Sequence, residues 1–103
     1  MKKPLFISIL SIFLSCSQNS IEKHCKHYRN HNDIESLRKA VELISIGTDT
    51  SSIRELLGEP IDFGFDYRYT TNTIGENGCP VGAVFGIDSL GKISSKSILE
   101  ICE

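Results

Sequence analysis

The feature that most constrains this chain is its first sixteen residues, in which two lysines and a short apolar stretch lead to a cysteine. Lys2 and Lys3 precede an apolar run over residues 5–14 that only two serines interrupt, and polar residues begin at Ser15. A helix that spans a bilayer needs roughly 20 apolar residues, so this run is too short to cross one. We interpret residues 1–15 as a cleaved targeting signal.

The residues around Cys16 resemble the lipobox of bacterial lipoproteins. Phe13 and Leu14 are apolar, and Ser15 supplies the small residue directly before the cysteine. The resemblance implies cleavage before Cys16 and attachment of lipid to that cysteine, which would anchor the chain in a membrane. Ser17 differs from the Asp that commonly retains such proteins in the inner membrane, which favours the outer membrane, facing the periplasm. The alternative is an ordinary secretory signal with a chance cysteine.

Length and charge limit what the remaining chain can be. Cleavage leaves 88 residues, enough for a single small domain. The loss of Lys2 and Lys3 changes the net charge from −2 to −4. A chain with this net negative charge is a poor ligand for nucleic acid, so we expect no nucleic-acid partner.

Residues 16–32 are interpreted as a lipidated polar tether. They show no sustained apolar period. The hydrophobicity of the segment is too low to offset the entropy that is lost when the segment becomes ordered. His24, His27 and His31 would share one face if the segment were helical, with the spacing of a copper or zinc site. We prefer to interpret them as solvated side chains and expect no metal, because structural zinc sites usually need four ligands of fixed geometry.

Two amphipathic helices are predicted to open the folded domain, residues 33–103. Asp33 can cap the first helix, and Gly47 stops it. The polar residues 48–51 can cap the second, which Gly58 and Pro60 end. Apolar side chains recur at helical spacing in both segments and predict one buried face for each: Ile34, Leu37, Val41 and Ile44, then Ile53, Leu56 and Leu57.

Three strands are predicted to follow the helices. Residues 63–69 alternate aromatic and small or polar side chains, and residues 81–87 alternate in the same way, so each has one buried face. Residues 88–92 form a hairpin turn that leads into a returning strand over residues 93–101. Residues 71–78 are interpreted as an exposed loop. The predicted fold is α+β, with two helices packed on a three-stranded antiparallel meander in a two-layer ααβββ sandwich. The aromatic side chains expected to line the core are Phe63, Phe65, Tyr67 and Tyr69.

Several of these segments resemble the signature of the BamE (SmpA/OmlA) lipoproteins. The residues that match are Ile46-Gly47, Ile53, Leu56-Leu57-Gly58-Glu59-Pro60, Tyr67-Arg68-Tyr69, Val84-Phe85-Gly86-Ile87-Asp88 and Gly91-Lys92-Ile93. The resemblance covers residues 44–98. It implies the same two-layer fold and a small outer-membrane lipoprotein that binds another envelope protein. The matched residues occupy turns and core positions, so they specify no chemistry.

No catalytic group is expected. All three histidines lie in the predicted tether, so a serine or cysteine within the domain has no base beside it. We therefore expect a non-catalytic interaction module with no cofactor and no small-molecule substrate. One alternative is an inhibitor or immunity-type protein of the same fold that uses the loop over residues 71–78. The other is a metal-binding envelope protein that uses the tether histidines.

A disulfide between Cys79 and Cys102 is predicted. Exported compartments are oxidising, and a domain this small has reason to use a covalent link. The hairpin centred on residues 89–91 brings Cys79 beside Cys102, whereas Cys25 lies in the tether. Strict alternation places the two side chains on opposite faces, a difficulty that Pro80 and Gly82 can relieve by interrupting the regular strand. Whether Cys25 is free or paired stays open.

Overall fold

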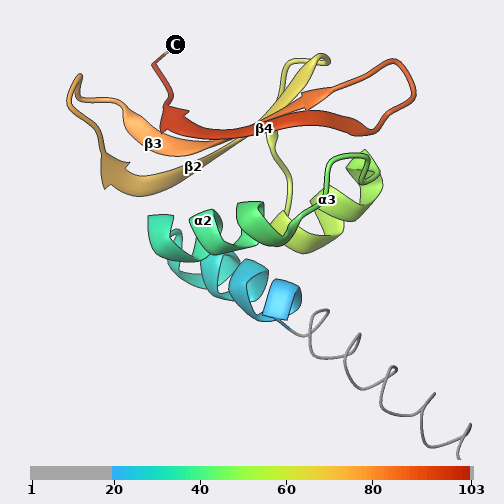
Figure 1. Cartoon of the computed structure of the whole chain (residues 1–103). Helices are drawn as coiled ribbons and strands as arrows, with labels where there is room; N and C mark the ends of the chain where they lie inside the picture. The colour runs from blue at the N-terminus through green and yellow to red at the C-terminus, as the bar shows by residue number, and fades with distance from the viewer. Residues whose placement is uncertain (1–19, 103) are drawn as a thin grey trace, which may run out of the picture.

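The computed structural model describes residues 20–102, and within that range the fold is α+β. The described residues form three helices and one antiparallel sheet in the strand order β1-β2-β3-β4. The helices lie on one face of the sheet (Figure 1). The two-layer meander expected from the sequence is therefore present, with one more helix and one more strand. The elements are a helix over residues 20–31, α2 (Ile34–Leu43), α3 (Thr50–Leu57), β1 (Ile61–Asp62), β2 (Asp66–Ile74), β3 (Pro80–Ile87) and β4 (Ile93–Glu100).

The two helices predicted from apolar spacing are confirmed, and so are Asp33 at the start of α2 and Gly58 at the end of α3. Gly47 does not end α2, which stops earlier, at Leu43, with Ile44 at its C-cap. The Asp33 carboxylate accepts the backbone N–H of Ser36 at 3.0 Å, which satisfies one of the unpaired donors at the start of α2. At the end of α3, Gly58 has φ of 89°, a conformation that favours glycine. The sequence identified these two boundaries because Asp33 and Gly58 have specific roles at a helix end.

The last turn of α2 is completed by a lysine from the sheet. Lys96 on β4 donates from Nζ to the carbonyl oxygens of Val41 and Ile44, both at 2.7 Å, and to that of Glu42 at 3.2 Å. Carbonyls in the last turn of a helix have no partner within the helix, and a cation there also interacts favourably with the helix dipole. Lys96 thus fastens α2 to the sheet.

The interpretation of residues 16–32 as a solvated tether is wrong for residues 20–31, which form a helix that packs on the domain. Cys25 is fully buried in the core, and Tyr28 is nearly so. The Tyr28 hydroxyl donates to the carbonyl oxygen of Thr70 at 2.6 Å, and Arg29 donates to that of Leu56. Ile21, Cys25 and Tyr28 follow one another at spacings of four and three, which makes a narrow apolar stripe. The folded domain therefore begins before Asp33.

The central strand β3 carries the core of the sheet. Ala83 and Phe85 are fully buried and face the helices, and the Tyr69 ring on β2 packs edge-on against that of Phe85 with centroids 6.0 Å apart. Glycine at position 82 allows β2 and β3 to approach closely, because a Cβ there would collide with the carbonyl oxygen of Tyr69. On its other edge, β3 pairs with β4, and these two strands form the hairpin predicted around residues 88–92.

Two details of the sheet differ from the sequence prediction. Strand β2 continues to Ile74, so the expected long loop over residues 71–78 is reduced to a short turn before Pro80. The predicted first strand is also divided: β1 and β2 form a hairpin around Gly64, whose φ is 86°. Of the four aromatic residues expected in the core, Tyr67 and Tyr69 are buried, but Phe63 and Phe65 are 44% and 66% exposed.

Candidate functional site

Residues 20–31 and α2 enclose a surface groove of about 680 Å³ that contains the three histidines. The ring centroids of His27 and His31 lie 4.3 Å apart, and His24 lines the same groove. The segment is helical, so the three histidines do share one face, as their spacing requires in a helix. Their nitrogen atoms do not converge on a metal position. Among residues 20–102, the one group of three or more possible ligand atoms close enough to share a metal ion lies elsewhere.

His27 belongs to a hydrogen-bonded group at the start of α2. Its Nδ1 lies 2.7 Å from the Ser36 hydroxyl and 3.0 Å from the Asp33 carboxylate. Burial alone would raise the pKa of Asp33, but hydrogen bonds from Ser36 and His27 outweigh it and lower that pKa to about 2. Asp33 is thus held as a carboxylate that caps the helix and binds His27.

The expectation that no histidine lies beside a serine is therefore wrong. A Ser-His-Asp triad uses both ring nitrogens, one toward the serine and the other toward the carboxylate. Here Ser36 and Asp33 both meet the same nitrogen, Nδ1, and Ser36 is only 8% exposed. Ser36 lines the groove, but its hydroxyl and the Asp33 carboxylate share one ring nitrogen, so the arrangement links the two helices without the geometry of a triad.

The structure contains a disulfide between Cys79 and Cys102, at the open end of the β3–β4 hairpin. The pairing Val81↔Glu100, continued toward the strand ends, sets the two cysteines opposite one another. A register shift between Gly86 and Ile87 produces this alignment. The difficulty of opposite faces is thus removed by a bulge near the turn, which was not anticipated from the sequence.

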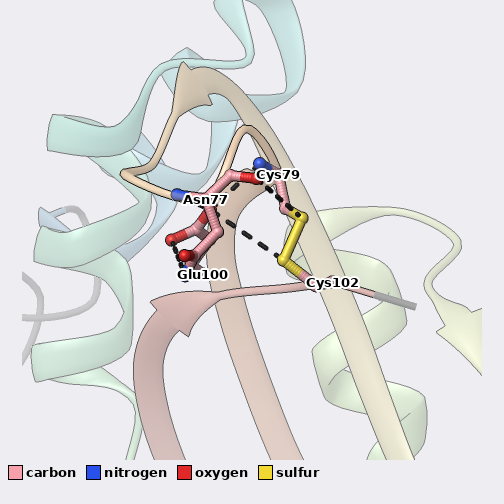
Figure 2. The surroundings of a disulfide bond; sticks show 4 residues. All are labelled: Asn77, Cys79, Glu100 and Cys102. Carbon is pink, nitrogen blue, oxygen red and sulfur yellow. Dashed lines mark hydrogen bonds between the residues drawn. A yellow bond between two sulfur atoms is a disulfide. The ribbon is translucent and has the colours of Figure 1, made fainter.

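Glu100 organises the turn beside this disulfide (Figure 2). Its carboxylate accepts the backbone N–H of Asn77 at 2.8 Å and that of Cys79 at 3.0 Å, and the Asn77 amide at 3.2 Å. Glu100, Cys79 and Cys102 are the one group in the described chain whose ligand atoms lie close enough for a metal ion. Because both sulfur atoms are bonded to each other and the carboxylate is occupied by N–H groups, the group fits a structural role.

Cys25 is the free cysteine of the described residues. Burial raises the pKa of its thiol to about 11, so the thiolate that would act as a nucleophile or metal ligand is strongly disfavoured. Tyr28 lies in the same cluster, and burial raises the pKa of its hydroxyl to about 12. Both side chains serve the packing of residues 20–31 against the domain.

The tip of the β1–β2 hairpin is a surface feature that the sequence prediction missed. Phe63 and Phe65 flank Gly64, and their ring centroids lie 6.3 Å apart with both side chains largely exposed. The Arg68 guanidinium lies 4.4 Å from the Phe63 centroid, which holds that ring in a cation–π contact. Ile61, also exposed, extends the apolar surface along β1. The Phe-Gly-Phe sequence was the available signal, since glycine interrupts a strand.

The lipidation site predicted at Cys16 lies outside the described residues. No helix within residues 20–102 is long and apolar enough to cross a membrane. The chain matches no family model, and no curated protein or solved structure matches it either.

Proposed function

We propose that this chain is a membrane-anchored lipoprotein of the cell envelope that acts as a non-catalytic protein-interaction module. Lipid on Cys16 would hold it on the outer membrane, facing the periplasm. The sequence resemblance to the BamE lipoproteins supports a role in outer-membrane assembly or maintenance, and the α+β architecture with helices on one face of a meander is compatible with it.

The observation that carries the proposal is the exposed aromatic pair on the β1–β2 hairpin. Phe63 and Phe65 place two large apolar rings in water on a hairpin that is fixed by hydrogen bonds. Gly64 donates its N–H to the Asp62 carboxylate at 2.8 Å, and Phe63 donates its N–H to the Asp66 carbonyl at 3.1 Å. Aromatic side chains that are rigid and exposed are the typical anchors of protein interfaces.

The position of this hairpin suits a protein held by its N-terminal end. The hairpin, yellow in Figure 1, lies far from the blue start of the helix over residues 20–31. Because that helix packs on the core through Cys25 and Tyr28, the helix and the hairpin belong to one folded unit. An anchor on Cys16 would thus leave Phe63 and Phe65 directed away from the membrane.

The two alternatives receive less support from the geometry. The inhibitory function depended on a long loop over residues 71–78, and that segment is a strand end and a short turn held by Glu100. The metal-binding function depended on the histidines, whose nitrogens do not converge in the described chain.

Photocrosslinking tests the proposed interaction. Benzoylphenylalanine would replace Phe65 in the full chain in cells, and a second variant would carry it in place of Leu90, an apolar residue 78% exposed on the β3–β4 turn. We expect a discrete crosslinked product at position 65 and none at position 90. Co-purification of barrel-assembly components with the tagged chain, lost in Phe65→Ser and retained in Leu90→Ser, would support the assembly role. Recovery of the chain alone under gentle detergent, with no product at position 65, would contradict the proposal.

A further inference from the structure

The positive charge of the folded chain is concentrated on the groove between the helix over residues 20–31 and α2. Four basic side chains line it, all exposed, with two acids and the three histidines. Residues 40–102 carry nine acids and four bases, so the rest of the domain is acidic. The groove is therefore a basic surface on an acidic protein. Its bases are Lys23, Lys26, Arg38 and Lys39.

These four bases differ from the others in having no partner. Within residues 20–102, no hydrogen bond or ion pair involves a groove base. Beyond residue 40, each base is engaged. Arg54 pairs with Asp62, Arg68 with Asp66 and Lys92 with Asp49, and Lys96 binds the carbonyls at the end of α2.

The acids of the groove do not neutralise it. Asp33 is committed to the N–H of Ser36 and to His27, which leaves Glu35 as the one further carboxylate among the lining residues. Lys23 and Lys26 come from one helix and Arg38 and Lys39 from the other, so the charge extends across both helices. A surface of this kind favours an extended anionic partner over a single small anion.

We propose that this groove faces the membrane and binds the anionic headgroups of the bilayer that holds the lipid anchor. The inference rests on the proposed lipid at Cys16. Four peptide units separate Cys16 from Ser20, which limits the distance between their Cα atoms to about 14 Å. Lys23 follows three residues after Ser20, so the groove begins close to the bilayer, where each base near an anionic surface contributes about 1 kcal/mol.

The consequence is a fixed orientation of the domain. The lipid alone would allow the domain to rotate about its attachment point, whereas contact through two helices would hold these helices on the membrane. In Figure 1 the sheet lies on one side of the helices, and the β1–β2 hairpin lies beyond the sheet. Phe63 and Phe65 would then be presented toward the periplasm.

Vesicle binding without the lipid tests this inference separately from anchoring. Residues 16–103 with Cys16→Ser contain the whole described core, and circular dichroism with a thermal melt would verify the fold of every variant. Cosedimentation would use vesicles of phosphatidylcholine alone and vesicles containing phosphatidylglycerol. We expect binding to the anionic vesicles alone, weakened by added salt. Each of Lys26→Gln and Lys39→Gln should lower the partition coefficient about five-fold, which is the expected 1 kcal/mol per base.

The control is Lys92→Gln, which removes the same charge from the turn between β3 and β4 and should change binding much less. Equal losses for Lys92→Gln and Lys39→Gln would overturn the assignment of the groove, as would equal binding to neutral and anionic vesicles. Displacement by inorganic phosphate at constant ionic strength would show a site for free phosphate and would also overturn the proposal. Because this protein carries no lipid, none of these outcomes depends on whether Cys16 is acylated in cells.

Discussion

Removing the disulfide between Cys79 and Cys102 should destabilise the domain strongly. The bond joins residues separated by 23 positions. On the chain-entropy model, a crosslink over such a loop restricts the unfolded chain by about 3 kcal/mol at 25 °C. In Cys79→Ser/Cys102→Ser the backbone N–H groups of residues 77 and 79 can still donate to the Glu100 carboxylate, because these bonds do not involve the cysteine side chains. The decrease in the free energy of unfolding should therefore come from the missing crosslink alone.

Urea unfolding and thermal melts of residues 16–103 with Cys16→Ser measure this effect. We expect the double variant to lose about 3 kcal/mol of unfolding free energy, and its Tm to fall by roughly 12–24 °C. A thiol reductant should destabilise the parent to the same extent and leave the double variant unchanged. A difference below about 1 kcal/mol, or an equal response of both proteins to reductant, would refute the reasoning.

Three further changes test individual contacts by the same unfolding measurements. Gly58→Val should cost about 1–3 kcal/mol, because φ at this position is 89° and valine is strained there; unchanged stability would show that α3 can end in another conformation. Lys96→Met should cost about 1–3 kcal/mol by leaving the carbonyls of Val41 and Ile44 without their donor, while Lys92→Met should cost below about 1 kcal/mol; equal losses would contradict this role. Asp33→Asn keeps a capping side chain but removes the charge. Because the folded pKa of Asp33 is about 2 against 3.8 for the free group, its stabilising effect should be present above about pH 4 and be lost as the pH falls through about 2; a gap between parent and variant that does not shrink as the pH falls through this range would be inconsistent with it.

The sequence predicted those parts of the fold that depend on local chemistry. The ends of α2 and α3 followed from Asp33 and Gly58, whose side chain or backbone has a specific role at a helix end. The β3–β4 hairpin followed from alternation and from its turn residues. In each case the residues that determine the local structure lie within one short stretch of the sequence.

The helix over residues 20–31 was missed because its apolar face is narrow. Ile21, Cys25 and Tyr28 are three positions among lysines and histidines, so the polar character of the segment indicated a solvated tether. Its stability depends on distant partners, including the Thr70 carbonyl that accepts the Tyr28 hydroxyl. Tertiary contacts of this kind cannot be predicted from the local sequence pattern. The helical spacing of the three apolar residues, in contrast, can be seen in the sequence.

The exposed aromatic pair was missed for a related reason. Alternation over residues 63–69 was assigned to one strand, and the role of Gly64 as a turn residue was not considered. The interruption exposes Phe63 and Phe65 while Tyr67 and Tyr69 remain in the core. The groove likewise required the helix hairpin, because its bases come from segments that the sequence prediction treated as tether and domain.

Membrane attachment through Cys16 is the central claim, and fractionation of cells that express the full chain tests it most directly. Metabolic labelling with a fatty acid, followed by separation of membranes from the soluble fraction, would compare the parent with Cys16→Ser. We predict a labelled, membrane-bound parent whose mass shows cleavage before Cys16, and a variant that is unlabelled and either soluble or unprocessed. A Cys16→Ser chain that stays on the membrane, labelled and with unchanged apparent mass, would contradict the account.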